Sequence, residues 1–567
     1  MFSWDSKPIE QFWQIAQPYW YSRGETQGRK LLFMSVCLSI ISSVILAIET
    51  IQRGEIISAL AIRDGDRFWQ TIIYLSLIII VSVPLLSFKT YIESKLALNW
   101  RKWLTDKFLH RYLEERRFYY LNNYSTLDNP DRTIAEDINE FSQQSLFLFL
   151  QTLDGLVQLI AFIGILWLVY KPMVLFLLIY SVVGTGILFL LFISKLTSIN
   201  IEQYRREADL RFGLIKVRDN TESIAFYGSE VLEESSVREK LKKAIANFNR
   251  LIKWQFNLDL FQNGFQFSTM ILPAILLAPS IFAGNIEIGA ISQSQIAFER
   301  IWLSLSLIIF QFEKITALAA GIKRIADLNE YLKSLSTDPA GNDNLIKIKT
   351  SKSLAFENVT LSVPDRNEQI IENLSLKIEP EKNILIVGNS GVGKTSLVRA
   401  IGGLWNSGSG SINKPRSSDI LFLPQSPYLI LGTFKEQLLY PYLENNISED
   451  KLLETIDKVN LGQVLNKFGT LDANEDWSRV LSRGEQQRLA FARLLLHQPK
   501  YAILDESTSA LDGDNQDSLY RILANTNTTY ISVGHRPNLL LYHQQVLQLI
   551  DSTTWSLIPA QEFSFNY

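Results

Sequence analysis

The stretch ILIVGNSGVGKTS, residues 384–396, predicts a buried strand, a glycine-rich loop and the start of a helix, in that order. Gly388, Gly393, Lys394 and Thr395 satisfy the pattern G-x-x-x-x-G-K-S/T. In such a loop, backbone N–H groups surround phosphates at a helix N-terminus, the lysine neutralises the β and γ phosphates, and the threonine hydroxyl ligates Mg²⁺. We therefore expect this loop to bind a nucleotide. The expected ligands are Gly388, Asn389, Ser390, Gly391, Val392, Gly393, Lys394, Thr395 and Ser396.

Two further strands carry candidate catalytic side chains at their ends. The run YAIL, residues 501–504, ends in Asp505 and Glu506, and TYISV, residues 529–533, leads through Gly534 to His535. An acidic residue at the end of a strand beside a phosphate loop can hold Mg²⁺, and a following carboxylate can polarise the attacking water. We expect Asp505 to be the metal ligand and Glu506 the general base, an effect worth typically about 10²- to 10⁴-fold in rate. We expect His535 to contact the γ-phosphate.

The 567 residues divide into regions of different composition. Long apolar runs lie almost entirely in residues 1–335, and short strand-like runs alternate with helical ones in residues 351–567. Between them, residues 336–350 include the linker-like STDPAGNDN. The sequence predicts a membrane domain, a linker and a soluble α/β domain with these bounds. The formal net charge of -3 gives no basic field for nucleic acid, and the single cysteine, Cys37, excludes an internal disulfide.

Six windows in the first region reach the roughly 20 apolar residues that a membrane span needs. Two long connections, residues 89–144 and 195–260, hold most of the Lys and Arg of this region. By the positive-inside rule these connections are cytoplasmic, which places both chain ends in the cytosol. The connections keep a helical apolar period, and FWQIAQPYWY, residues 12–21, suggests an interfacial helix. The six predicted spans begin at Leu31, Phe68, Ser145, Pro172, Phe261 and Gly289.

Four charged residues lie in or beside these spans. A charge at mid-bilayer costs at least about 2.5 to 3.5 kcal/mol, so each one needs a reason. Either these residues face a polar translocation cavity, or they pair inside the helix bundle or lie at a span boundary. The candidates are Asp154, Asp259, Glu299 and Arg300.

The soluble region resembles the ATP-binding cassette (ABC) domain over its whole length. The phosphate loop is followed by Gln425 in FLPQSPY, LSRGEQQRL from Leu481, ILDES, SALD and His535, in the order of the cassette's Q-loop, signature, metal-binding strand, D-loop and H-loop. The resemblance implies that two cassettes dimerise head to tail, each binding ATP between its own phosphate loop and the partner's signature. It assigns Gln425 to catalysis and Mg²⁺ binding. The further residues that it implicates are Ser482, Gly484 and Glu485 of the signature and Ser509, Ala510, Leu511 and Asp512 of the D-loop.

Two positions depart from the common cassette pattern. Arg483 stands where glycine is usual, and it either points outward into solvent or adds positive charge near the nucleotide or the facing cassette. Val363 stands where many cassettes stack an aromatic side chain on adenine. Base stacking is therefore weaker or supplied from elsewhere.

The membrane region also carries short stretches that resemble a known branch. PYWYSRGE from Pro18, LDNPDRTIAEDI from Leu127 and ESIAFYGSE from Glu222 are similar to the SbmA/BacA-like bacterial ABC transporters and to the related peroxisomal fatty-acyl half transporters. In that fold, helices at the bottom of the cytoplasmic connections dock on the cassettes. The alternative is an ordinary helix start enriched in acids. The coupling candidates are Asn129, Asp131, Glu136 and Asp137.

Together these patterns predict an ABC half transporter: an exporter-like helical domain of six spans fused to one α/β cassette. The predicted molecule hydrolyses ATP with Mg²⁺, pairs with a second copy of itself, and lies in the lipid bilayer of a bacterial inner membrane. The resemblance favours uptake of a bulky hydrophilic or amphipathic solute, such as cobalamin or hydrophilic peptides. Two alternatives are an exporter of lipid, acyl-CoA or peptide, and a membrane ATPase that gates a passive conduit or regulates a partner.

Overall fold

The computed structural model describes residues 7–22, 24–124, 127, 129–335, 345–364, 368–444 and 447–565. The chain forms two compact units, Met1–Ser336 and Thr337–Tyr567. Most of the predicted linker, residues 336–344, lies outside the described residues.

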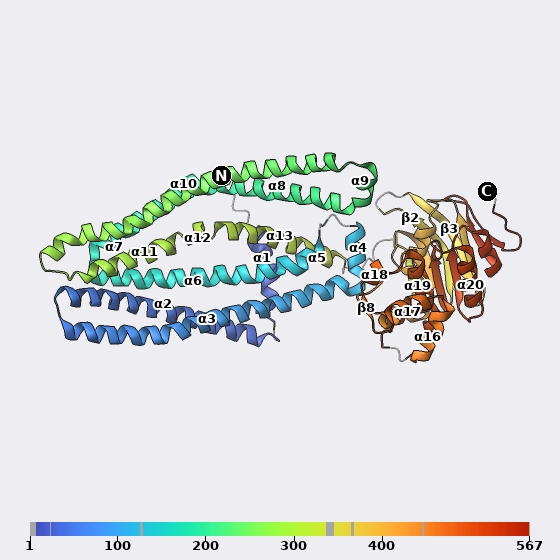
Figure 1. The fold of residues 1–567 in the computed structure, drawn as a ribbon, viewed down its shortest axis with the longest axis horizontal. Coiled ribbons are helices and arrows are strands. Elements are labelled where there is room, and N and C mark those ends of the chain that lie inside the picture. The colour runs from blue at the N-terminus through green and yellow to red at the C-terminus, as the bar shows by residue number, and fades with distance from the viewer. Residues whose placement is uncertain are drawn as a thin grey trace. The chain divides into compact units, whose positions relative to one another are not determined.

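The first unit is entirely helical over its described residues (Figure 1). Apolar side chains on its long helices are widely exposed, with Leu168 84% and Ile160 74% exposed. A continuous helix satisfies its own backbone hydrogen bonds, so it can present such a surface to lipid. The helices are α1 (Lys7–Trp20), α2 (Thr26–Ala61), α3 (Gly65–Leu113), α4 (Arg117–Tyr124), α5 (Pro130–Arg132), α6 (Ile138–Val169), α7 (Lys171–Leu188), α8 (Ser194–Asp219), α9 (Thr221–Tyr227), α10 (Glu230–Phe282), α11 (Gly289–Leu305), α12 (Leu307–Phe310) and α13 (Phe312–Ser334).

Among the described residues, five helical segments are long and apolar enough to cross a membrane. They correspond to the first five predicted spans. The sixth predicted window, residues 289–310, is divided between α11 and α12 by a break at Ser306, and a further break at Gln311 separates α12 from α13. The buried Ser306 hydroxyl lies 3.3 Å from the Thr185 hydroxyl of α7, so a polar contact coincides with the first break. The five segments are Thr26–Ala61, Gly65–Asn123, Pro130–Val169, Lys171–Asp219 and Glu230–Phe282.

The predicted tight connection between the third and fourth spans is a single residue. Tyr170 is extended, with φ -159° and ψ 101°, between the end of α6 and the start of α7. Pro172 occupies the first turn of α7, where its missing N–H costs no hydrogen bond. Over their described residues, the long connections are mostly helical, as predicted, and α10 continues for 53 residues.

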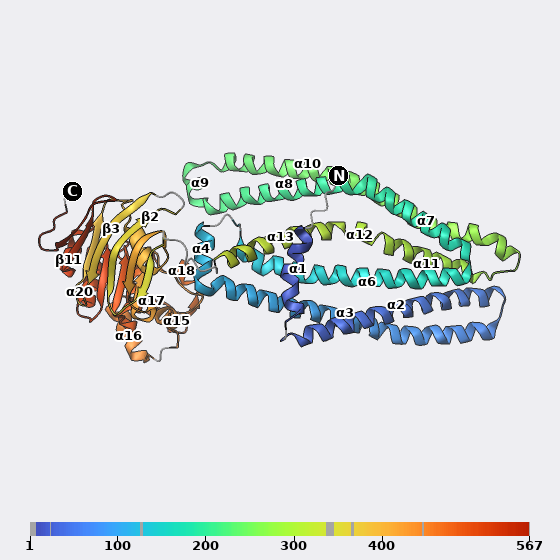
Figure 2. The ribbon, with the colours of Figure 1, turned by 180° about the vertical axis from the view of Figure 1, so that it is seen from behind.

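The N-terminal helix α1 runs across the long helices (Figures 1 and 2). Its buried side chains are Ile15, Ala16 and Tyr19, and the Tyr19 ring stacks on Trp100 of α3 with 5.9 Å between centroids. The apolar face of α1 is therefore packed on the unit itself.

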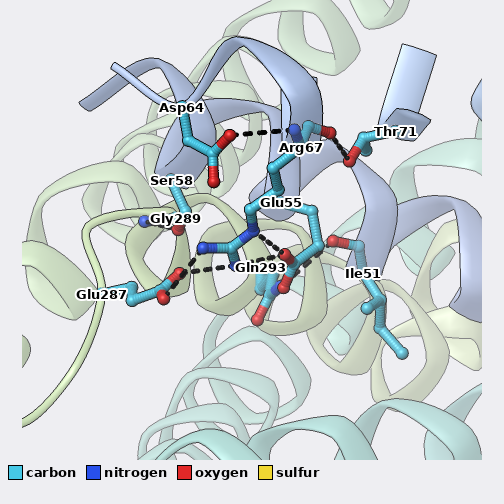
Figure 3. A network of polar contacts seen from close by, with 9 residues as sticks. All are labelled: Ile51, Glu55, Ser58, Asp64, Arg67, Thr71, Glu287, Gly289 and Gln293. Atoms are coloured by element: carbon cyan, nitrogen blue, oxygen red, sulfur yellow. Dashed lines mark hydrogen bonds and ion pairs between the residues drawn. The ribbon is translucent and has the colours of Figure 1, made fainter. Parts of the chain in front are cut away.

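A polar cluster joins α2, α3 and the turn between α10 and α11 at one end of this unit (Figure 3). Arg67 donates to both carboxylate oxygens of Glu287, at 3.0 and 2.8 Å, and its Nε donates to Glu55 at 3.0 Å. Beneath it, the Gly289 N–H donates to the Ser58 hydroxyl at 3.1 Å. A Cβ on Gly289 would lie 2.0 Å from the Gly54 carbonyl oxygen, so glycine lets α2 and α11 approach closely.

The second unit contains a six-stranded sheet in the order β12-β11-β4-β10-β9-β6, a four-stranded sheet in the order β1-β5-β2-β3, and the pair β7-β8. Neighbours from β11 to β6 are parallel, and β12 is antiparallel to β11. The strands are β1 (Lys347–Thr350), β2 (Leu354–Ser362), β3 (Gln369–Ile378), β4 (Ile384–Gly388), β5 (Gly408–Lys414), β6 (Ile420–Leu423), β7 (Gly432–Thr433), β8 (Asn474–Glu475), β9 (Tyr501–Asp505), β10 (Thr529–Val533), β11 (Gln545–Leu549) and β12 (Trp555–Pro559).

The six-stranded sheet separates two cores because successive strand residues point to opposite faces. In β4, Leu385 and Val387 join one core, whereas Ile384 and Ile386 join the other. Both faces are buried, which explains why the sequence shows continuous apolar runs at these strands. The helices of this unit are α14 (Lys394–Gly402), α15 (Phe434–Leu439), α16 (Glu449–Lys458), α17 (Gly462–Phe468), α18 (Trp477–Val480), α19 (Arg483–His497) and α20 (Gly513–Ala524).

Candidate active site

Three adjacent parallel strands bring the predicted motifs to one edge of the sheet. In the register, Val533 of β10 is paired with Ile386 of β4 on one side and with Asp505 of β9 on the other. Parallel strands end at a common edge, so the segments that follow them are neighbours. The phosphate loop, Glu506 and His535 therefore lie side by side.

The phosphate loop requires glycine at two positions. Gly388 has φ 153° and Gly393 has φ 104°. A Cβ would lie 2.4 Å from the Leu549 carbonyl oxygen at Gly388 and 2.3 Å from Ile370 at Gly393. The predicted ligands Asn389, Ser390, Gly391 and Thr395 are exposed, while Val392 and Ser396 are half-buried.

Lys394 is buried at the first position of α14. Its Nζ donates to the carbonyl oxygens of Gly388 and Asn389, at 2.7 and 2.8 Å. Burial lowers the pKa of this ammonium, and the carboxylates of Glu506 and Asp505 oppose that shift. The amine is thus held at the loop, where it can exchange carbonyl oxygens for phosphate oxygens.

Glu506 is the meeting point of the candidate catalytic residues. Its carboxylate accepts a hydrogen bond from Gln425 Nε2 at 3.0 Å, and its other oxygen lies 3.7 Å from His535 Nε2. Its backbone has φ 47°, a conformation uncommon for residues other than glycine, and its N–H donates to the Val533 carbonyl at 3.2 Å. The backbone therefore turns this carboxylate out of β9 toward Gln425 and His535.

Asp505 ends β9 beside this group. Burial raises the pKa of Asp505 and the charge of Glu506 raises it further, while Arg399 and Lys394 oppose the shift. Among the described residues, no three His, Cys, Asp or Glu side chains gather to hold a metal. The donor set of one carboxylate, the Thr395 hydroxyl and the Gln425 amide oxygen instead fits Mg²⁺, which keeps water ligands and shares phosphate oxygens.

The signature segment forms the capped start of α19. Ser482 is the N-cap: its Oγ accepts from the Glu485 N–H at 3.3 Å, while the Glu485 carboxylate accepts from the Ser482 N–H at 2.8 Å. A Cβ on Gly484 would lie 3.4 Å from the Ala510 carbonyl oxygen, so the signature touches the D-loop. Asp512 at the end of the D-loop caps α20 by accepting from the Asn515 N–H at 2.8 Å.

The two departures from the cassette pattern have simple surroundings. Arg483 is exposed and has no ion pair with any residue that the structure describes. Val363 is half-buried, and its N–H donates to the Glu368 carbonyl at 2.8 Å. An exposed Arg483 fits both predictions, because a side chain that points into solvent in one chain can also face the nucleotide or a partner cassette.

The four coupling candidates differ in exposure. Asn129, Asp131 and Glu136 are exposed, and Glu136 pairs with Arg132 at 3.0 Å. Asp137 is 2% exposed and forms a bidentate pair with Arg324 of α13, with both distances 2.7 Å. Its carboxylate is therefore engaged inside the helical unit.

The four cavity candidates also differ in their contacts and exposure. Asp154 forms an ion pair with Lys89 of α3 at 2.6 Å, which corresponds to pairing within the bundle. Glu299 accepts from Gln266 Nε2 at 3.0 Å, and Glu299 and Arg300 are both half-buried. Asp259 is exposed on α10.

Comparisons with known proteins cover both units. Residues 18–282 match the family model described as ABC transporter transmembrane region 2, and residues 371–509 match the one described as ABC transporter. An ABC transporter ATP-binding protein of Synechocystis is 43% identical over 539 residues, which cover 93% of this chain and 80% of that protein. The chain belongs to the ABC transporter family.

Other ABC transporters extend this finding. ABC transporter D family member 2, chloroplastic, of Arabidopsis thaliana is 35% identical, covering 95% of this chain and 86% of that protein. The lysosomal cobalamin transporter ABCD4 of Mus musculus is 30% identical, covering 98% and 96%. A bacterial Atm1-family ABC exporter with ATP bound shares the fold, with TM-score 0.73 at 16% identity, covering 94% of this chain and 96% of that one.

This ABC transporter is a half transporter related to the D family, with a helical membrane domain fused to one cassette. The fold prediction is confirmed. The prediction of ATP hydrolysis coupled to transport is also confirmed, because that is the activity of the cassette family.

Two residues that contact the functional loops of this ABC cassette, Gln487 and Arg536, received no role from the sequence. Gln487 of α19 contacts both the Q-loop and the D-loop, and Arg536 donates to the D-loop carbonyls of Leu511 at 2.8 Å and Ser509 at 3.2 Å. One signal was available for Gln487. It is the polar member of the stripe formed with Ala490, Phe491 and Leu494, whose spacing marks the buried face of a helix.

Proposed function

We propose that this half transporter works as a homodimer in which two cassettes bind head to tail around two ATP molecules. The chain has one phosphate loop and one signature, so two copies supply two complete sites. Ser482, Gly484 and Glu485, with the first turn of α19, would contact the ATP held by the partner's phosphate loop. A helix start suits a γ-phosphate, because its first backbone N–H groups have no carbonyl partner within the helix.

The observation that carries the catalytic part is the meeting of Gln425, Glu506 and His535 beside the phosphate loop. In the proposal Glu506 accepts a proton from the attacking water, and Gln425 and His535 orient that water and the γ-phosphate. Lys394 neutralises phosphate charge. Thr395, Asp505 and Gln425 would hold Mg²⁺, which supplies charge neutralisation on the phosphates.

The proposed cycle couples closure of the cassettes to the membrane domain. The exposed residues Asn129, Asp131 and Glu136 are coupling candidates, whereas Asp137 would fix their segment to α13 through Arg324. Glu299 and Arg300 are the remaining candidates for a polar cavity surface. The proposed location is a bacterial inner membrane with both chain ends in the cytosol.

For the solute, we propose a bulky hydrophilic or amphipathic molecule that is taken up, with cobalamin first and hydrophilic peptides second. The similarity to a mouse protein named as a cobalamin transporter supports the first choice. The stretches that resemble the SbmA/BacA-like branch support the second.

The test is ATP hydrolysis by the purified chain in lipid nanodiscs, with cobalamin, hydrophilic peptides, acyl-CoA and lipids added in turn. Glu506→Gln gives the background. Stimulation by cobalamin or a peptide alone would support the proposed solute class. Stimulation by lipid or acyl-CoA would contradict it, and hydrolysis indifferent to every compound would favour the ATPase that regulates a partner or gates a conduit.

A further inference from the structure

The side chain of Gln487 joins two functional loops of the cassette. Its Nε2 donates to the carbonyl oxygen of Gln425 at 3.1 Å and to the Ser509 hydroxyl at 3.3 Å. Its Oε1 accepts from the Ala510 N–H at 3.0 Å. The three partners lie 62, 22 and 23 residues away in the sequence. One amide therefore connects the Q-loop to the D-loop.

Burying the Gln487 amide costs free energy unless these hydrogen bonds are formed. The residue is 2% exposed and shares the buried face of α19 with apolar side chains. A buried amide without partners costs roughly 1 to 3 kcal/mol in proteins. Since an apolar side chain would fill the same space, packing alone gives no reason for an amide here.

The contact with Gln425 places Gln487 next to the chemistry without touching it. Gln425 is held through its backbone carbonyl by Gln487, and its own side chain donates to Glu506 at 3.0 Å. A shift of the Q-loop backbone would move that amide away from Glu506. An error of about 1 Å in the placement of a catalytic group can cost on the order of a hundredfold in rate.

The D-loop is held from a second direction, so its position is defined by two segments. Arg536, directly after His535, donates to the carbonyls of Leu511 and Ser509 and to the Gln516 side chain at 2.8 Å. Gln487 supplies the bonds to Ser509 and Ala510 from α19. The signature helix and the segment after His535 therefore both form hydrogen bonds with the D-loop, residues 509–512.

We propose that Gln487 is a positioning residue for ATP hydrolysis: it fixes the Q-loop backbone so that the Gln425 amide stays bonded to Glu506, and it ties that arrangement to the D-loop and the signature helix. The inference rests on the roles given to Gln425 and Glu506 under the proposed function. It does not depend on the solute.

The test uses the full chain in nanodiscs and compares Gln487→Met with Gln544→Met. Methionine keeps the length of the side chain and removes its hydrogen bonds. Gln544 is a matched control, because its side chain also bonds a distant backbone group, accepting from the Asn383 N–H at 2.8 Å, and it precedes β11 at the edge of the sheet opposite the phosphate loop. We expect Gln487→Met to lower kcat by about ten- to a hundredfold with ATP binding affinity unchanged and only a small fall in thermal midpoint, and Gln544→Met to keep wild-type kcat.

A double variant separates positioning from a general loss of structure. Because Gln487 acts through Gln425, Gln425→Ala combined with Gln487→Met should lose no more kcat than Gln425→Ala alone. Losses that multiply, or a wild-type kcat in Gln487→Met, would overturn the inference, as would an equal loss in Gln544→Met. Wild-type hydrolysis no greater than that of Glu506→Gln would instead contradict the proposed function.

If Gln487→Met does not fold, Gln487→Glu takes its place. The carboxylate still accepts from the Ala510 N–H, and the Ser509 hydroxyl can turn to donate to it, but it cannot donate to the Gln425 carbonyl. The contact with the Q-loop is therefore the one that is lost. The same fall in kcat with bound ATP retained supports the inference. A wild-type kcat overturns it.

Discussion

Charged residues serve opposite purposes in the two units. In the membrane domain, Asp154 is neutralised by Lys89 and Glu287 by Arg67, so buried or crowded charge is paired across helices. In the cassette, two carboxylates stand side by side, and the nearest partners of Glu506 are an amide and a histidine 3.7 Å away. The first arrangement stabilises a fold. The second leaves Glu506 without a close cation, as the proposed role of proton acceptor requires.

The comparison teaches that a charge in an apolar sequence is weak evidence for function until its partner is known. Glu506 could be assigned from its motif, whereas the sequence left Asp154 between a polar cavity and an ion pair within the bundle, and only the contact with Lys89 shows the ion pair. Removing a charge or its partner in either unit tests this contrast.

The largest effect is expected at Glu506. Glu506→Gln removes the proposed base and retains the shape and the contact with Gln425, so turnover should fall by about 10²- to 10⁴-fold while ATP still binds. ATPase assays and nucleotide binding by the purified variant measure the two properties separately. Glu562→Gln, an exposed acid of the same unit, is the control and should leave both unchanged.

The next effect is expected at Lys89. Its partner Asp154 is 18% exposed, and removing the partner of a largely buried charge costs about 3 to 5 kcal/mol, so Lys89→Met should lower the free energy of unfolding by this order. Thermal unfolding in nanodiscs measures the change. Lys89→Met with Asp154→Leu should recover part of the loss, because Glu93, 3.8 Å from Lys89, loses this partner in both variants. A double variant as unstable as the single one would show that the pair with Asp154 is not the cause.

A smaller effect is expected at Arg67, since the side chains of this cluster are 29% to 53% exposed. Arg67→Gln should cost about 1 kcal/mol, whereas Arg53→Gln, which removes only a pair within α2, should cost less. Arg67→Glu with Glu287→Arg restores one cation between two acids and should regain stability. Instability of the swapped variant equal to that of Arg67→Glu would contradict this role.

The same cluster predicts a pH dependence. Hydrogen bonds from Arg67 hold the pKa of Glu287 below its usual range. The stability that this pair contributes is therefore present above the unfolded-state pKa of glutamate and is lost as the pH falls through the lowered value. Unfolding measured across this acid range should show a smaller slope in Arg67→Gln than in the wild type.

The smallest effect is expected at Arg483, which is exposed at the first position of α19. Arg483→Gly should change ATPase activity by less than about twofold, because surface substitutions away from special features usually change little. Ser482→Arg, one residue earlier, should impair hydrolysis because it removes the N-cap hydroxyl. A collapse of activity in Arg483→Gly would assign this arginine to the nucleotide.

The cassette site was readable from the sequence because each motif follows a strand or starts a helix, and parallel strands end at one edge. That rule alone predicts that the phosphate loop, Asp505, Glu506 and His535 lie together. Helical spacing could mark Gln487 as a polar residue on a buried face, but its role and that of Arg536 could not be assigned, because their partners lie on other segments and side-chain hydrogen bonds leave no periodic pattern. In the membrane domain, hydropathy located the helices, but which residue faces Asp154 depends on helix rotation, and the break at Ser306 coincides with a contact to Thr185 that no local pattern reveals.

The uninterrupted helix α10 has a mechanical consequence. Its 53 residues span about 80 Å at 1.5 Å per residue, with Pro273 and Pro279 both near its C-terminal end. A continuous helix of this length is stiff, so a small tilt at one end displaces the other end by several ångströms. Bending is easiest at the prolines, so the rest of the rod moves as a rigid arm. A displacement of the N-terminal end of α10 is therefore transmitted to its membrane-spanning portion.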